Sequence, residues 1–376
     1  MEVETIFLTD DLLFFQEKID SYRQNFSDRA GGFELPKVEY LGRFQFATKV
    51  ETENEVFISI PVKNQESIIE KVLMSLSQNI GMNYSIGLLF DNCTDNSLQA
   101  SFDVIKSKLV MDPYIKKVYI LKSYDELFES TCENILFKFC ENNFFVSLQA
   151  DIYFYDLTFL NRAINAFLKI PELFALSGKA IVPFKIVSPK KKLVSRIIKL
   201  LTQPIIVSSS LSSRIKLGIN RSYLQYFGDL SQSPYSEMVF TNKQLATVNF
   251  GEAVIRGPVI WRSILFQRFK GFDDVAFYLG RDDCDLSFRA FLDGYRVGYL
   301  PCKFKSFYEE GTTRKIRTPA VISALNDRNN LAKQFPGKLH QFWSDNLQQG
   351  MSNKLTFYKN YWGRSHKFSI VLKDKS

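Results

Sequence analysis

Val56-Phe57-Ile58-Ser59-Ile60-Pro61 begins the regular part of this sequence. The run is short, apolar and rich in β-branched residues, which is typical of a buried strand, and Pro61 ends it. Apolar residues then recur at helical spacing over residues 66–79, and Gly81 ends that pattern. The sequence thus predicts a unit of strand, loop and helix, and this unit recurs downstream.

Three further strands are predicted at residues 85–90, 117–121 and 144–148, with helical patterns between them. Four strands that alternate with three helices predict an α/β fold with a mostly parallel sheet flanked by helices. Ligands of such sheets bind beyond the carboxyl ends of the strands. We therefore expect ligand-binding residues at 61–64, at 91–97 and at Asp151.

The composition limits the classes of function. The 376 residues are 45% hydrophobic, which is enough for one large domain with appendages or for two modest domains. The chain has only two histidines, His340 and His366. Catalysis of the Ser-His-Asp type and histidine-rich metal sites therefore have almost no residues to use, and acid–base chemistry falls to carboxylates.

The cysteines and the N-terminus bear on the cell compartment. The five cysteines form no CxxC pair, which argues against a disulfide framework and a zinc site and favours a reducing compartment. The first residues lack the basic region and the apolar core of a secretory signal. No apolar run approaches the roughly 18 residues that span a bilayer. We expect a cytoplasmic protein, either soluble or peripheral at a membrane surface.

Basic residues concentrate in one segment. The net charge is +8, and residues 173–228 hold ten Lys and Arg but no acidic residue. Within Lys185–Arg221 these cations mix with apolar residues at near-helical spacing. Such a segment could rest on an anionic membrane, bind an acidic acceptor glycan, or form a solvated or self-packed helix pair. No nucleic-acid-binding motif accompanies the charge, so we expect no nucleic acid as a partner.

Two strand ends carry polar residues that suit a nucleotide. Asp151 directly follows a predicted buried strand, where a carboxylate could hold Mg²⁺ or Mn²⁺ against a diphosphate, or could simply cap the turn. Residues 91–97 offer hydrogen-bonding side chains at nearly every position. They suit the reading of a base and ribose, or form a plain Asx-rich turn.

Asp282, Asp283 and Asp285 begin a predicted helix that ends at Gly294. A helix dipole favours carboxylates at this end, so ordinary capping is one interpretation. Repulsion among three clustered acids would instead raise the proton affinity of at least one, which suits a general base. The two effects are opposed, and the sequence leaves both open.

The order and spacing of these pieces resemble family 2 glycosyltransferases over roughly residues 55–310. The segments that carry the resemblance are Ile58–Glu66, Phe90–Ser97, Leu148–Ile152, Gly271–Asp273, Gly280–Arg289 and Gly294–Val297. The resemblance implies a GT-A fold, with a Rossmann-like nucleotide-binding sheet, and a nucleotide-sugar donor that is usually UDP-linked. It also implies a divalent metal, Mn²⁺ or Mg²⁺, inversion at the anomeric carbon, and a glycan or lipid-linked acceptor, as in polysaccharide biosynthesis.

The resemblance also implies a division of the chain. Residues 51–310 would form the GT-A domain, with a nucleotide-binding half at 51–155 and an acceptor and catalytic half at 156–310. Residues 1–50 would be an N-terminal extension, and residues 311–376 a mainly helical C-terminal one.

Roles for single residues follow from the same resemblance. Asp283 matches the general base, with Asp282 and Asp285 beside it, while Asp91 matches the aspartate that reads the nucleobase and Asp151 the last aspartate of the metal-binding DxD. The residues expected to bind the nucleotide sugar are Pro61, Val62, Asn64, Glu66, Asp91, Asn92, Gln149, Ala150 and Arg289.

Three positions depart from the family pattern. Gln149 stands at the first position of the DxD, which removes one carboxylate and would lower metal affinity. Asp282 replaces the usual glutamate of the Glu-Asp pair, which keeps the charge. Many relatives have a histidine after the acidic helix as a further metal ligand, and Glu309 stands near that place.

Two other classes of function remain open. Gln149 and the missing histidine would also fit a catalytically silent glycan- or membrane-binding protein on the same fold. A metal-dependent nucleotidyltransferase needs a similar sheet, metal and nucleotide site, but the acidic helix argues against it.

Overall fold

The computed structural model describes residues 6–9, 11–47, 50, 52–178, 242–251, 253–254, 256–306, 318–341 and 369–372. The basic segment Lys185–Arg221 and the predicted metal ligand Glu309 lie outside these residues. No helix in the described ranges is long and apolar enough to cross a membrane.

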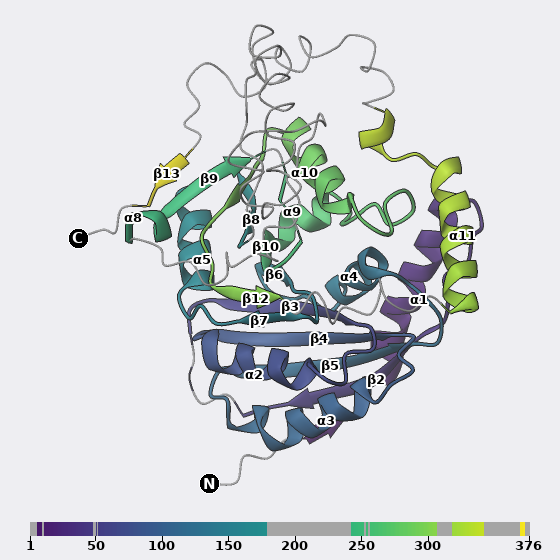
Figure 1. The fold of residues 1–376 in the computed structure, drawn as a ribbon, viewed down its shortest axis with the longest axis horizontal. Helices are drawn as coiled ribbons and strands as arrows, with labels where there is room; N and C mark the ends of the chain where they lie inside the picture. The colour runs from purple at the N-terminus through teal and green to yellow at the C-terminus, as the bar shows by residue number, and fades with distance from the viewer. Residues whose placement is uncertain are drawn as a thin grey trace, which may run out of the picture.

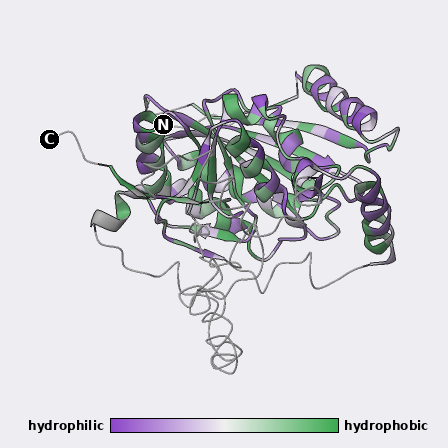
Figure 2. Cartoon of the chain, turned by 90° about the horizontal axis from the view of Figure 1, so that it is seen from above, coloured by the Kyte–Doolittle hydropathy of each residue, from purple (hydrophilic) through white to green (hydrophobic). Residues whose placement is uncertain are grey.

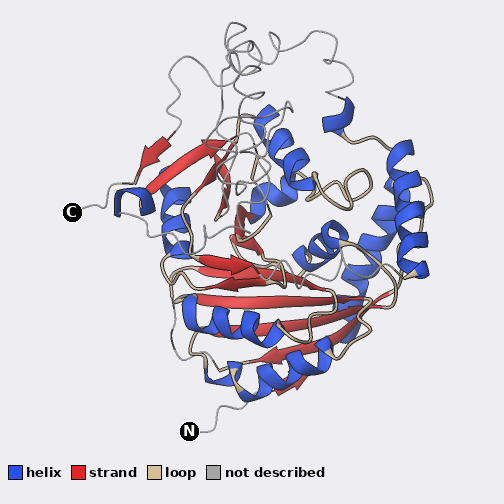
Figure 3. Cartoon of the chain, in the orientation of Figure 1, coloured by secondary structure: helices blue, strands red, loops and turns tan. Residues whose placement is uncertain are grey.

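The first half of the chain alternates strands and helices, as predicted (Figure 3). Its elements are β1 (Ile6–Leu8), α1 (Leu12–Arg29), β2 (Val38–Gln45), β3 (Glu55–Val62), α2 (Ile69–Asn79), β4 (Asn83–Asp91), α3 (Ser97–Ser107), the 3-10 turn η1 (Leu109–Met111), β5 (Ile115–Ser123), α4 (Glu129–Phe137), β6 (Phe144–Ser147), β7 (Ile152–Phe154) and α5 (Phe159–Lys169). The second half contributes β8 (Leu173–Ser177), α8 (Asn242–Leu245), β9 (Thr247–Gly251), β10 (Val259–Arg262), α9 (Ser263–Arg268), α10 (Asp282–Leu292), β11 (Arg296–Tyr299), β12 (Phe304–Ser306), α11 (Pro319–Gln334) and β13 (Ser369–Val371).

A central sheet positions the candidate site. In the described part of the chain its strand order is β1-β2-β5-β4-β3-β6-β10-β8-β11-β9-β13. The four predicted strands lie together as β5-β4-β3-β6 and run parallel, which confirms the α/β class and the parallel core. Strands β2 and β10 join this core antiparallel. Because the chain moves outward from β3 through β4 to β5 and then returns to the other side at β6, the sheet has a switch point between β3 and β6, where ligands bind in folds of this kind.

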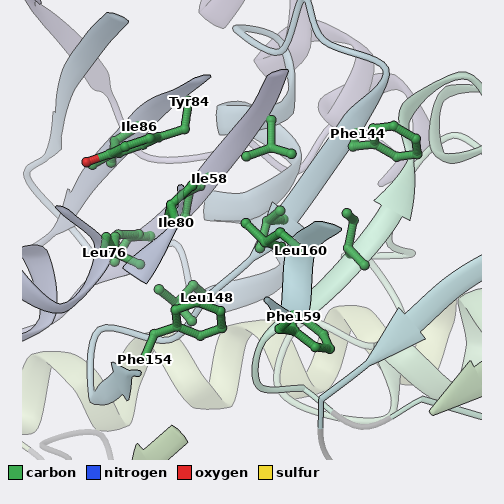
Figure 4. Packing of buried hydrophobic residues seen from close by; sticks show 14 of the residues in the cluster. Ile58, Leu76, Ile80, Tyr84, Ile86, Phe144, Leu148, Phe154, Phe159 and Leu160 are labelled. Carbon is green, nitrogen blue, oxygen red and sulfur yellow. The ribbon is translucent and has the colours of Figure 1, made fainter. Parts of the chain in front are cut away.

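Two apolar cores cover the faces of the sheet. One core joins the strands to α2, α3 and α5, and the other joins them to α1, α4, α9 and α10. Figure 4 shows part of the first, where Ile58 and Ile86 of neighbouring strands pack near Leu76 and Leu160. Each such fully buried side chain contributes about 1.5–3 kcal/mol. In Figure 2 the apolar residues gather along the central strands and the polar ones on peripheral helices.

The segment expected as an N-terminal extension is built into this sheet. Strand β2 pairs with β5, and β1 pairs with β2. Helix α1 packs beside the C-terminal helix α11 (Figure 1), where the guanidinium of Arg328 lies 4.8 Å from the ring centre of Phe26. At the opposite edge β13 pairs with β9. Both ends of the chain therefore contribute to the same structure as residues 51–310.

Candidate active site

Asp91 ends β4 and is buried. Its carboxylate accepts hydrogen bonds from the backbone amides of Leu127 (2.8 Å) and Phe128 (3.1 Å) and from the hydroxyl of Ser123 (3.0 Å). Burial raises the pKa of Asp91, and these amides oppose the rise. Helix α4 begins at Glu129, directly after the two amides that Asp91 holds. The carboxylate assigned to the nucleobase thus fixes the loop that leads into α4.

The loops after β3 and β4 are joined side by side. Asn64 Oδ1 accepts from the amide of Thr94 (2.7 Å), and Glu66 accepts from both the backbone and the side-chain amide of Asn96 (3.1 Å each). Asn64 has a φ of 48°, a left-handed conformation that asparagine tolerates. The structure therefore brings Asn64 and Glu66 together at the carboxyl edge of the sheet, as expected for a ligand-binding edge.

Lys63 extends this connection toward α4. Its ammonium group donates to the carbonyl of Asn92 (2.7 Å) and forms an ion pair with the nearly buried Glu126. Burial is the largest cause that raises the pKa of Glu126, and Lys63 opposes it. Pro61 and Val62 are the last strand residues before this loop. The predicted nucleotide-binding residues 61–66 and 91–92 thus form one connected group, within which Val62 and Asp91 are buried.

Gln149, Ala150 and Asp151 form a turn between β6 and β7, closed by the bond from the amide of Ile152 to the carbonyl of Gln149 (3.0 Å). Asp151 is partly exposed, and its Oδ2 accepts from Ser306 (3.4 Å). A strand-end carboxylate of this kind fits a divalent ion that is shared with a diphosphate. No cluster of three or more His, Cys, Asp or Glu side chains able to hold a metal occurs among the described residues, which include the predicted ligand Asp151 but not Glu309.

Gln149 donates from its amide nitrogen to Glu129 Oε1 (3.2 Å), at the first position of α4. An aspartate at position 149 would place a carboxylate against that carboxylate. Gln149 instead adds an uncharged donor to Glu129 Oε1, which also pairs with Arg256.

The three acids at the start of α10 have different surroundings. Asp282 is fully buried and accepts from Ser130 (2.7 Å), and it also forms an ion pair with Arg256. Asp285 accepts from Arg289 Nε (2.7 Å). Asp283 accepts from the backbone amides of Arg256 (3.0 Å) and Cys284 (2.8 Å).

The proton affinities of these acids have a different origin from the one expected. The pKa values of Asp283 and Asp285 are raised, and burial is the largest cause for both, rather than repulsion within the cluster. Consecutive helical residues are about 100° apart around the axis, so the side chains diverge toward different partners. The pKa of Asp283 is raised, as a general base requires, and the main cause is desolvation.

Arg289 is used within the fold. Besides Asp285, its guanidinium donates to the carbonyls of Phe269 and Gly271 (2.8 Å for the latter). These bonds hold the turn before α10. The bonds that the structure assigns to Arg289 thus support α10 rather than the edge of β3 and β4, and its expected contact with the donor stays a prediction.

Sequence reasoning missed the group that connects the motifs. Arg256 is buried and pairs with Glu129 (2.9 Å), Glu133 (3.1 Å) and Asp282, and Ser147 donates to Glu133 (3.1 Å). Burial raises the pKa of Glu133 to about 7, while Arg256 opposes the rise. The available signal was the polar sequence Glu129-Ser130-Thr131-Cys132-Glu133-Asn134, which places polar side chains all round a short helix.

Helix α4 therefore joins all three motif groups. Asp91 holds the loop before it, Gln149 bonds its first residue, Glu129, and Asp282 bonds its second, Ser130. Figure 1 shows α4 between the sheet and α10. The turn at residues 149–151, the end of β4 and the acidic helix thus converge on one helical turn.

The chain has no significant match among protein-family models or curated protein sequences. Solved structures of similar fold include TarS 1-349 of S. aureus, with 14% identity and a TM-score of 0.41 over 82% of this chain and 77% of that chain. The same protein in complex with UDP-GlcNAc matches with 15% identity and a TM-score of 0.40 over 82% and 79%. The mannosyltransferase PcManGT of Pyrobaculum calidifontis, in complex with GDP-Man and Mn²⁺, matches with 13% identity and a TM-score of 0.45 over 93% and 92%. These similarities concern the fold alone.

Proposed function

We propose that this chain is a glycosyltransferase, which moves a sugar from a nucleotide-diphosphate donor, a UDP-sugar in the first instance, to a hydroxyl group of a glycan or lipid-linked acceptor. The observation that carries the proposal is the convergence of Asp91, Gln149 and Asp282 on the start of α4. It places the strand ends and the acidic helix on one support, at the edge where parallel sheets bind ligands.

The donor would lie across the ends of β3, β4 and β6. The connected loops at residues 61–66 and 91–97 would bind the nucleotide, and Asp151 would hold Mn²⁺ or Mg²⁺ together with the donor diphosphate. When bound, the ion neutralises charge that develops on the leaving diphosphate. Asp151 is partly exposed, which leaves its carboxylate accessible to a bound donor.

Asp283 would act as the base. Its carboxylate accepts the proton of the acceptor hydroxyl as the hydroxyl oxygen bonds to the anomeric carbon and the bond from that carbon to the diphosphate oxygen breaks, with inversion. The raised pKa of Asp283, caused by burial, brings its proton affinity closer to that required of a base at neutral pH. The amides of Arg256 and Cys284 hold the carboxylate in place.

Transfer from a panel of nucleotide sugars, with and without Mn²⁺, tests this proposal. Asp283→Asn should lower the turnover number about 10²–10⁴-fold and leave donor affinity unchanged, because a positioned base contributes about that much. Asp103→Asn is a matched control, since Asp103 is exposed on α3, and it should retain wild-type turnover.

Intact transfer by Asp283→Asn would show that the base is another residue. If the wild-type protein neither binds nor consumes any nucleotide sugar, the enzymatic proposal is wrong, and a silent glycan-binding role on the same fold takes its place.

A further inference from the structure

A cavity of about 810 Å³ lies beside the last turn of α10, and Arg289 is the predicted site residue that lines it. It is bounded by the turn at residues 268–275, by α10 and by residues 334–341 that follow α11. Its cationic lining residues are Arg29, Arg268, Lys270, Arg289 and Lys338, and its acidic ones are Asp273 and Asp293. The lining residues alone have a net charge of +3, which falls to +1 when Asp274 and Asp285, the ion-pair partners of Arg29 and Arg289, are counted with them.

Two lysines carry the charge that the protein leaves unbalanced. The three arginines each have a carboxylate partner, in the pairs Arg29–Asp274 (3.1 Å), Arg268–Asp293 (2.5 Å) and Arg289–Asp285 (2.7 Å). Lys270 and Lys338 are exposed and form no ion pair with any residue that the structure describes. Both ammonium groups remain available to an anion in the cavity.

A rigid turn holds Lys270 in place. Lys270 has a φ of 61° and Gly271 a φ of 66°, a left-handed pair of conformations that a lysine rarely adopts. The carbonyl of Gly271 accepts from Arg289 (2.8 Å), and Asn134 makes two hydrogen bonds of 2.9 Å to the backbone of Phe272. The turn is thus fixed from α10 and from α4.

The rest of the lining suits a saccharide rather than a small ion. Phe269 and Phe335 are only partly buried and present aromatic surface to the cavity, and Gln334 and Gln341 add amide groups. Aromatic faces pack against the apolar faces of sugar rings, and amides both donate to and accept from hydroxyl groups. A volume of about 810 Å³ accommodates a ligand of two or more sugar rings.

A second cavity, of about 580 Å³, leads toward the acidic helix. It is lined by Gly280 and Arg281, which directly precede Asp282, and it shares the lining residue Pro336 with the first cavity. The two cavities are therefore adjacent, and the second one adjoins the start of α10.

We propose that the cationic cavity binds an anionic segment of a saccharide acceptor, one that bears carboxylate or phosphate groups, while the reacting hydroxyl lies at the start of α10. The role of this saccharide as an acceptor rests on the proposed glycosyltransferase function, whereas its binding to the cavity does not depend on turnover.

Fluorescence anisotropy tests the binding with three labelled probes of equal length: an oligogalacturonate, a phosphomannan oligosaccharide and a neutral malto-oligosaccharide. The wild-type protein should prefer one or both anionic probes, with an affinity that falls as salt rises. Lys270→Gln/Lys338→Gln should weaken anionic binding roughly tenfold, as expected for two lost charges at about 6 Å in water. Lys37→Gln/Lys106→Gln removes the same charge at exposed positions that line neither cavity, and should bind like wild type.

The two anionic probes separate carboxylate from phosphate as the recognised group. Equal affinity for the neutral probe, or unchanged anionic binding by the Lys270 and Lys338 variant, would overturn the inference. Equal losses in both double variants would also overturn it, because they would indicate a general effect of net charge. If anionic binding depends on the two lysines but no sugar is ever transferred, the proposed function fails and the binding site stands.

Discussion

Replacing Arg256 by methionine removes a cation that balances a buried group of acids. Arg256 is 8% exposed, and its partners Glu133 and Asp282 are 1% and 0% exposed. Methionine keeps much of the length of the side chain but none of the charge, so two carboxylates lose their partner in the interior. Breaking a buried ion pair from one side costs about 3–5 kcal/mol, and we expect Arg256→Met to lower the free energy of unfolding by that amount at pH 8.5.

The loss should depend on pH in a defined direction. Burial raises the pKa of Glu133 from 4.5 to about 7 in the folded protein. The folded state therefore binds this proton more tightly than the unfolded chain, so the stabilisation is complete below pH 4.5 and is lost as pH rises through about 7. The difference between the two pKa values corresponds to about 3 kcal/mol. Without Arg256 the pKa of Glu133 rises further, so the penalty should be smaller at pH 5.5 than at pH 8.5.

Urea unfolding at about pH 5.5, 7 and 8.5 measures these effects. Glu133→Gln should flatten the pH dependence of the wild-type protein, because glutamine keeps an acceptor for Ser147 but does not titrate. In the Arg256→Met background, Glu133→Gln should recover part of the loss at pH 8.5. A loss by Arg256→Met below about 1 kcal/mol, or one that is the same at all three pH values, would refute the reasoning.

Two further substitutions test the supports of the site. Gly271→Ala should lower the free energy of unfolding by about 3 kcal/mol or more, because φ is 66° and the new Cβ would lie 2.4 Å from Asn134 Oδ1. Gly32→Ala, with a φ of 92° and open space around the Cβ, should cost only the backbone strain of about 1–2 kcal/mol, and equal losses in urea would contradict this account. Gln149→Asp should lower the melting temperature at low salt, because it opposes Glu129 with a like charge, and high salt should reduce the difference. A melting temperature unchanged at low salt would show that Gln149 and Glu129 do not interact as described.

The parallel core could be predicted because its signals are local. Strand β3 carries an apolar run and α2 carries one apolar face, so each element is defined by its own residues. The strand was expected to end at Pro61, but it continues to Val62, which pairs with Phe90 of β4. Chirality and connectivity then leave few arrangements of four strands and three helices. The same reasoning located Asp91 and Asp151 at strand ends before any contact was known.

The group around Arg256 could not be predicted in this way. Arg256 bonds Ser130 across 126 residues of sequence, and its own surroundings give no periodic pattern. The acids of α10 show the same limit, since their spacing suggested mutual repulsion, whereas burial dominates their pKa values. Desolvation depends on packing by distant segments, so a residue's neighbours in sequence do not report it.

Helix α4 shows why the site needs a polar helix in its interior. An apolar helix would pack against the sheet equally well, but it would leave Gln149 without its acceptor Glu129 and Asp282 without its donor Ser130, at about 0.5–1.5 kcal/mol for each lost hydrogen bond. The nine residues of α4 instead offer Glu129 to the turn at residues 149–151, Ser130 to the acidic helix and Asn134 to the turn before that helix. Because these positions belong to one rigid element, a shift of α4 would move all three together. Their relative geometry is therefore set by a single short helix rather than by three independent loops, which is the kind of preorganisation that catalysis requires.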